Sequence, residues 1–406
     1  MRRSAILAVA AVLAASLPAE DAPQQSDLMR IYNGLVKVSS GRNFSISTNG
    51  TTAAKFMGSI FGEYTIWNPK LQLRIGEIPS AKVSILSTMV GDRVDFAVTG
   101  KLPEDLHLSR ELAALKPVDK GLFKYIPANA SIVYVSAVPG DSPLDHHALP
   151  IRANFVEQLR AMMPPRATYR DFAAFAAPAK KGVGIAAVFV FRLASAVPPL
   201  DSFSGNKVAS VFTLDTPKSD DDQLPDGYSR YAVTSSFKDA LGSGSSVVDE
   251  ELRFAAAANA VMGPMTLEVA CHDGYVFFDV GPAGDLKERL SRPEGSTFDV
   301  KSLLPLLRPG LSPEGLRTAI YMSPSAATRR TLAGLGSLLK PVMAGLAPDG
   351  DGFSGVVIVG QDGDFTWGWS ATRSELEAFE KNQGIVQNTF KTILMHGANI
   401  RAFGGE

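Results

Sequence analysis

The sequence predicts an α+β fold with mainly antiparallel sheets covered by helices. The main observation is a recurring β-hairpin pattern, in which two runs rich in valine and aromatic residues flank a short turn of glycine and aspartate. It occurs at 83–100 around Gly91-Asp92, at 267–281 around Asp273-Gly274 and at 355–371 around Asp362-Gly363. A helical pattern follows each hairpin. This recurrence predicts two similar halves built from hairpin–helix–strand–helix–hairpin units.

A second observation assigns the buried face of each hairpin. Successive side chains of a strand point to opposite faces of the sheet. Alignment of the hairpins on their turns gives one apolar face in all three copies, made of Val94, Phe96 and Val98, of Val276, Phe278 and Val280, and of Phe365, Trp367 and Trp369. One apolar face is what a sheet packed beneath helices requires.

The elements between the hairpins also follow a pattern. Short apolar strands with a tyrosine are expected at 125–138 and 311–325, followed by helices at 149–163 and 325–346. After the third hairpin, Thr372 and Glu375 match a capping box. In that motif each of the two side chains accepts a hydrogen bond from the backbone N–H of the other residue.

The first residues predict a secretory signal peptide at 1–19. Arg2 and Arg3 precede an apolar run that ends at Leu17, followed by small residues suited to cleavage near Ala19. The run is too short to cross a bilayer. The acidic, turn-rich segment 216–229 is expected to separate a first α+β half at 20–215 from a second at 230–406.

Composition excludes several classes of partner. The formal net charge is -1 and 20% of the residues are charged, which leaves no electrostatic footprint for nucleic acid. No later apolar run is long enough for a transmembrane helix, so none is expected after signal cleavage. The chain has one cysteine, which rules out an internal disulfide. No phosphate-binding or dinucleotide fingerprint is present, and no cofactor is expected.

Cys271, His272 and Asp273 form the first tempting chemical cluster. A thiol nucleophile needs a histidine within hydrogen-bonding reach. Neighbouring strand residues point to opposite faces, so Cys271 and His272 cannot meet, and Asp273 is favoured at a turn for backbone reasons. We therefore expect a structural cysteine beside a hairpin turn.

Three groups of residues resemble metal ligands, but their spacing does not predict a metal site. Asp145, His146 and His147 offer ligands that suit zinc, but zinc needs three or four groups converging in space, and consecutive residues rarely do so. The acidic residues Asp220, Asp221 and Asp222, and the pair Asp349 and Asp351, lack the spacing of a calcium-binding loop. Solvated loops are expected at all of these places, and no metal site is predicted.

Serine acyl transfer is suggested only by a short motif. Serine and lysine three residues apart share one face of a helix, so the lysine can take the serine proton. The spacing occurs at Ser204–Lys207, Ser235–Lys238 and Ser337–Lys340, without companion motifs. Separately, Phe365, Trp367 and Trp369 resemble a sugar-binding platform, but their alignment with Val and Phe in the other hairpins predicts core positions.

The sequence therefore predicts an exported protein, periplasmic or secreted, with no catalytic, cofactor-binding or metal-binding residue assigned. A non-enzymatic binding or scaffold role is the leading hypothesis, with an unknown protein, an envelope component or an apolar ligand as partner. An apolar-ligand or lipid carrier and a serine hydrolase using a Ser-x-x-Lys pair are the alternatives. Within the second hairpin, the face that carries Phe277 and Asp279 is the first place to look for a function.

Overall fold

The computed structural model describes residues 27–39, 43–61, 82–101, 116–137, 168–179, 185–194, 207–209, 212–214, 228–235, 266–281, 285–291, 298, 315–334, 340–348, 352–359, 364–382 and 384–385. The predicted signal peptide, 1–19, lies outside them. Within them, no helix is long and apolar enough to cross a membrane.

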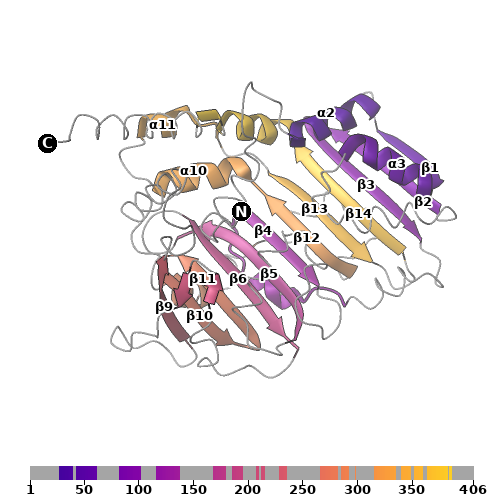
Figure 1. The fold of residues 1–406 in the computed structure, drawn as a ribbon. Coiled ribbons are helices and arrows are strands. Elements are labelled where there is room, and N and C mark those ends of the chain that lie inside the picture. The colour runs from indigo at the N-terminus through magenta and orange to yellow at the C-terminus, as the bar shows by residue number, and fades with distance from the viewer. Residues whose placement is uncertain are drawn as a thin grey trace, which may run out of the picture.

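The described strands form one continuous sheet of 14 strands, and every described pairing is antiparallel (Figure 1). The strands are β1 (Phe44–Asn49), β2 (Lys82–Val90), β3 (Arg93–Lys101), β4 (Ile132–Ala137), β5 (Tyr169–Pro178), β6 (Ile185–Leu193), β7 (Lys207–Ala209), β8 (Phe212–Leu214), β9 (Tyr228–Ser235), β10 (Thr266–His272), β11 (Tyr275–Gly281), β12 (Leu316–Met322), β13 (Phe353–Val359) and β14 (Asp364–Thr372). Their order across the sheet is β1-β2-β3-β14-β13-β12-β4-β5-β6-β11-β10-β9-β8-β7.

The described helices are few and short. They are α2 (Asp27–Ser39), α3 (Gly50–Phe61), the 3₁₀ helix η1 (Lys120–Tyr125), α9 (Asp285–Leu290), α10 (Pro324–Gly334), α11 (Lys340–Gly345) and a helix over residues 373–382. The expected strands at 125–138 and 311–325 are β4 and β12, which pair with each other. The helix expected at 149–163 lies outside the described residues.

The predicted fold class is wrong. An α+β fold of sheets covered by helices was expected, in two similar halves of hairpin–helix–strand–helix–hairpin units, whereas one large antiparallel sheet dominates the molecule. The sequence pattern identified the hairpins but not the way in which they join. Backbone hydrogen bonds between β3 and β14, and between β6 and β11, connect the hairpins edge to edge into a single sheet.

The strand order is symmetric about the contact between β4 and β12. Outward from it, the first six strands are β4-β5-β6-β11-β10-β9 on one side, where the short β8 and β7 follow, and β12-β13-β14-β3-β2-β1 on the other. On each side, three strands from one part of the chain are followed by three strands from the other part. The two parts therefore interlock within the sheet. The domain division at 216–229 falls almost entirely outside the described residues and stays a prediction.

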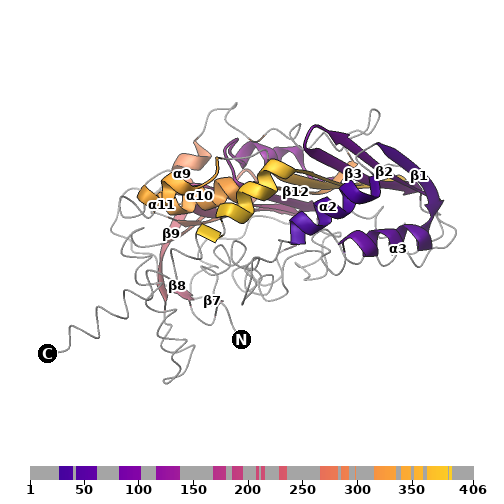
Figure 2. The same ribbon diagram turned by 90° about the horizontal axis from the view of Figure 1, so that it is seen from above.

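The two faces of the sheet carry different elements. We call the front face the one that carries Phe96, Phe278 and Trp369, and the back face the one that carries Phe277 and Asp279. Helices α2 and α3 lie over the front face at the β1 end (Figure 2). There the ring of Phe56 stacks on that of Phe96, with the centroids 6.3 Å apart. Helix α9 and η1 lie over the back face.

The apolar face predicted from the three hairpins is confirmed. All nine aligned side chains point to the front face, as the strand registers require. Eight of them are buried, and Val280 is half-buried. Phe365, Trp367 and Trp369 are thus core residues, with exposed fractions of 2%, 8% and 0%, and do not form an exposed platform for sugar rings.

Candidate functional site

The hairpin of β10 and β11 turns as the sequence predicts. Asp273 and Gly274 have φ angles of 51° and 79°, which is the backbone conformation that a type I′ turn requires at both central positions. The carboxylate of Asp273 accepts a hydrogen bond from Lys124 Nζ at 3.3 Å and lies 3.4 Å from Nε2 of His272. Side chains at this turn are half exposed, so these contacts are surface contacts.

Cys271 is not a nucleophile in this setting. It lies one residue before His272 on β10, opposite Val276, and its side chain therefore points to the other face from the imidazole. Burial raises the pKa of its thiol to about 11. The thiol is protonated at neutral pH, and the thiolate is the reactive form.

The back face of the same hairpin holds a buried cluster of charged side chains, which we call the α9 cluster: Glu268 of β10, Asp279 of β11, and Asp285 and Arg289 of α9. Glu268 and Asp279 lie directly opposite each other in the antiparallel pair. Arg289 donates to Asp279 Oδ2 from Nε at 2.8 Å and to Asp285 Oδ2 from Nη2 at 3.1 Å. The Leu286 backbone N–H donates to Glu268 Oε2 at 2.8 Å.

The α9 cluster combines deep burial with an excess of acidic groups over basic ones. All four residues are 5% exposed or less. The cluster holds three carboxyl groups and one guanidinium, which contacts Asp279 and Asp285, so full ionisation leaves two negative charges in excess in a low-dielectric environment. Burial raises the pKa of Asp279 to about 7; Arg289 opposes the rise, and the charges of Asp285 and Glu268 add to it.

A second buried carboxyl group, that of Asp171, lies on the back face near the start of β5, whereas Arg289 of the α9 cluster contacts Pro178 at the end of this strand. Asp171 Oδ2 accepts a hydrogen bond from the backbone N–H of Asp119 at 2.8 Å. Asp119 in turn accepts from the Tyr275 hydroxyl at 3.1 Å and forms an ion pair with Arg192. Burial raises the pKa of Asp171 to about 6, although the Asp119 N–H and Arg192 lower it.

This second group is closely fitted around η1. Asp119 is the N-cap of η1, and its Oδ1 accepts from the Gly121 N–H at 2.8 Å. A Cβ at position 121 would lie 2.6 Å from the Tyr275 hydroxyl oxygen, which only glycine avoids. The Asp119 group therefore anchors η1 on the sheet.

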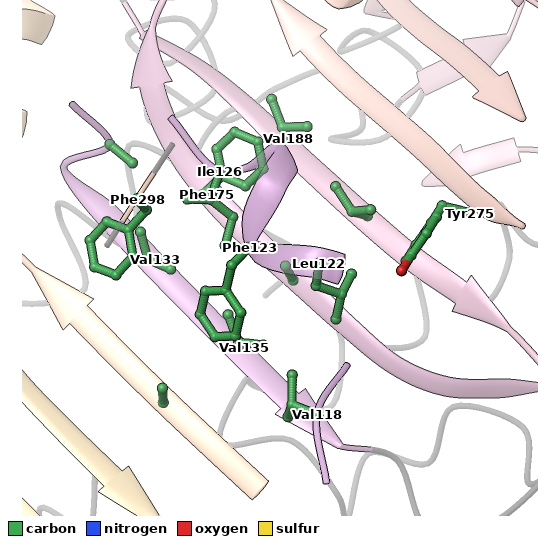
Figure 3. Packing of buried hydrophobic residues seen from close by; sticks show 14 of the residues in the cluster. Val118, Leu122, Phe123, Ile126, Val133, Val135, Phe175, Val188, Tyr275 and Phe298 are labelled. Atoms are coloured by element: carbon green, nitrogen blue, oxygen red, sulfur yellow. The ribbon is translucent and has the colours of Figure 1, made fainter. Parts of the chain in front are cut away.

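Between the two polar groups lies an apolar cluster of β4, β5, β6 and β11 beneath η1. Leu122 and Phe123 of η1 pack against strand residues that include Val133 and Val135, with Tyr275 at the margin (Figure 3). Phe277 belongs to this cluster and is 1% exposed. The back face is thus sealed by side chains at its centre and holds ionisable groups on either side.

A third buried polar group joins α10 to the helix over 373–382. Glu375 is fully buried and accepts from the Ser325 N–H at 3.0 Å, from Ser325 Oγ at 2.7 Å and from Ser323 Oγ at 3.4 Å. Half of the predicted capping box is present, because the Glu375 N–H donates to Thr372 Oγ1 at 3.4 Å. The Glu375 carboxylate therefore connects the helix over 373–382 to the start of α10.

Several residues considered from the sequence lie outside the described residues. These are Asp145, His146 and His147, Ser204, Lys238 and Ser337, Asp220, Asp221 and Asp222, and Asp349 and Asp351. Lys207 lies in β7, Ser235 at the end of β9, and Lys340 at the start of α11. Within the described part of the chain, no group of three or more His, Cys, Asp or Glu side chains is arranged to hold a metal ion.

Comparison with known proteins adds no functional information, because no family model, curated protein or solved structure matches the chain.

The sequence pointed to the Phe277 and Asp279 face without identifying the partners. The signal that was available is the alternation on β11, which places a carboxylate on the same face as Tyr275 and Phe277. Arg289 and Asp285, four residues apart, could have been paired as helical neighbours. Their burial against Asp279 depends on how α9 returns onto the sheet.

Proposed function

We propose that the protein is an exported, non-enzymatic binding protein that receives an extended segment of a partner protein along the free edge of β1. The observation that carries the proposal is that β1 is paired along one side only among the described residues and is exposed to solvent. Among the described residues β1 pairs only with β2, and Ser45, Ile46 and Ser47 are exposed on both faces of the strand.

Edge strands are normally protected against pairing with other chains. Charged side chains, proline or a bulge are the common protections. The β1 sequence, FSISTN, contains no charge and no proline, and its register with β2 runs without a bulge. Such an edge suits strand addition, in which main-chain hydrogen bonds give affinity and side-chain positions give specificity.

Ile46 gives the edge an apolar contact point. It lies opposite Ile85, on the face beneath α3, and is 46% exposed, whereas Ile85 is 1% exposed. The exposed large apolar side chains of the described residues are Val38 of α2, Ile46 of β1 and Val90 of β2. A partner residue beside Ile46 would continue the apolar layer under α3.

Charge narrows the choice of partner. Within residues 27–39, 43–61 and 82–90, Asp27 is the only acidic residue, whereas Lys37, Lys55 and Lys82 are all exposed. Lys82 lies opposite Asn49 at one end of β1. The partner segment that fits is extended, carries an apolar residue opposite Ile46 and has acidic residues beside it. A second copy would bring another basic surface and is less suitable.

The test places a photo-crosslinking amino acid at position 46, with position 90 as the matched control. Both residues are exposed and apolar, but Val90 lies at the hairpin end of β2. In the exporting host we expect a crosslink from position 46 to an extended, acidic segment, and none from position 90. A synthetic peptide of that segment should bind the wild type and bind Ile46→Lys at least tenfold more weakly, with Val90→Lys unaffected.

Two results would overturn the proposal. One is equal binding of the peptide to the wild type and to Ile46→Lys. The other is a crosslink from position 46 to a second copy of the chain, which would make β1 a self-association edge. Export is tested separately, since the mature N-terminus of protein recovered outside the cytoplasm should follow Ala19.

The two alternative functions stay untested. Ser204 and Ser337 lie outside the described residues, so the hydrolase hypothesis gains no support from the structure. The carrier hypothesis needs a cavity between a curved sheet and two helices, one of which, at 149–163, also lies outside them.

A further inference from the structure

Helix α9 is joined to the sheet chiefly by the α9 cluster. The helix has six residues and packs on β10 and β11. Leu286 and Leu290 contribute apolar contacts, and Arg289 adds a hydrogen bond from Nη2 to the carbonyl oxygen of Pro178 at 3.0 Å. Two further hydrogen bonds to the sheet join Arg289 to Asp279 and the Leu286 N–H to Glu268.

We propose that the α9 cluster is a proton-controlled latch, which holds α9 on the sheet when the cluster carries one proton and loosens it when that proton is lost. The inference does not depend on the proposed function of β1. It follows from three features of the geometry: the excess of carboxylates over cations, their burial, and an incompletely satisfied oxygen.

The charged groups around Asp279 are few. From β10 it faces Glu268, and from α9 it faces Asp285 and Arg289, while Lys287 and Glu288 of the same helix point to solvent. One guanidinium cannot neutralise three buried carboxylates. A proton on one carboxyl group lowers the excess negative charge from two to one, with no need for a second basic side chain.

Asp279 is the group best suited to carry that proton. Its Oδ2 accepts from Arg289, whereas its Oδ1 is buried and has no hydrogen-bond partner among the described residues. Burial of a charged Oδ1 without a hydrogen bond costs much more free energy than burial of the neutral, protonated group. The Nη1 of Arg289 is likewise buried without a described partner, so the guanidinium does not compensate Oδ1.

The direction of the pH effect follows from the raised pKa of Asp279. Its folded value, about 7, lies above the ordinary value of 3.8. The folded state therefore holds the proton more tightly than the open state, and the stabilisation is complete below about pH 4. It is lost as the pH rises to about 7 and changes no further above that. Acid thus favours the latched state of α9.

Amide hydrogen exchange of α9 tests the latch in the full chain. After correction for the intrinsic rate, protection of the amides of residues 286–290 should fall between pH 5 and pH 8, by at least tenfold and at most about a hundredfold. In Asp279→Asn, which keeps the shape of the neutral acid, protection should be independent of pH over this range.

Asp171→Asn is the matched control, because Asp171 is also a buried carboxyl with a raised pKa but lies beside η1. It should leave the pH dependence at α9 unchanged. Protection of α9 that does not vary with pH in the wild type, or that varies equally in wild type and Asp279→Asn, would refute the latch.

A measurement on Asp171→Asn, with Asp279 intact, guards against failure of Asp279→Asn to fold. Its infrared spectrum at pH 6 should contain the carbonyl band of a protonated carboxylic acid, and this band should disappear as the pH rises through about 7. Absence of such a band would also refute the proposal.

Discussion

Removal of the Glu375 carboxylate should destabilise the protein far more than removal of a carboxylate two residues further along the same helix. In Glu375→Ala, the Ser325 N–H and two serine hydroxyls lose the acceptor that they share at 2.7–3.4 Å. All three residues are buried, with exposed fractions of 3% or less, so water cannot take the place of the carboxylate without opening the contact between α10 and 373–382.

The magnitude follows from the number of hydrogen bonds lost. A hydrogen bond to a charged group contributes about 1.5–3 kcal/mol, and the two shorter bonds dominate. Allowing for their lack of additivity, we expect a loss of about 3–5 kcal/mol in the free energy of unfolding. Glu375→Gln should lie between wild type and Glu375→Ala, because its amide oxygen still accepts one bond while its NH₂ group faces a donor.

Glu377→Ala is the matched control. Glu377 accepts from Arg373 Nε at 2.7 Å, but its side chain is 56% exposed and the pair is screened by solvent. Urea unfolding followed by tryptophan fluorescence measures both variants, since Trp367 and Trp369 report on the neighbouring β14. A loss in Glu375→Ala no larger than that in Glu377→Ala would refute the assigned role of Glu375.

Two further predictions concern the reactivity of Cys271 and the pairing of strands from the two parts of the chain. Alkylation of Cys271 by iodoacetamide should be slow at pH 7 and should accelerate about tenfold per pH unit up to pH 10, because burial raises the thiol pKa to about 11; a rate that levels off near pH 8 would contradict this assignment. Two fragments produced by division of the chain within 216–227 should co-purify when expressed together and aggregate when expressed alone, because β3 pairs with β14 and β6 with β11. Independent soluble folding of either fragment would show that these pairings are dispensable.

The part of the fold that could be predicted is the part determined locally. The turn at Asp273 and Gly274 followed from residue types that accept positive φ, and the structure places both residues there. The burial of Trp369 followed from alternation alone. The capping box at Thr372 and Glu375 was half right: the Glu375 N–H donates to Thr372 Oγ1, and the carboxylate binds Ser323 and Ser325 at the start of α10 instead.

The fold class was mispredicted because it depends on contacts between distant segments. Each hairpin satisfies the same local pattern whether it belongs to a small covered sheet or to a long continuous one. The pairing of β3 with β14 joins the edges of two hairpins that lie far apart in the chain. An edge leaves backbone N–H and C=O groups unpaired, and joining two edges removes that cost.

The sequence by itself determined the hairpins, the turns at Gly91 and at Asp273-Gly274, and the apolar front face, because each depends on backbone geometry or on residues adjacent in the chain. Only the tertiary structure decided the length of the sheet, the position of β1 at its edge among the described strands, and the α9 cluster. Burial is a property of the whole assembly of strands and helices: Asp279 is an ordinary strand carboxylate until α9 covers it with Arg289 and Asp285. The same covering changes its proton affinity, which is a chemical property that no local pattern could reveal.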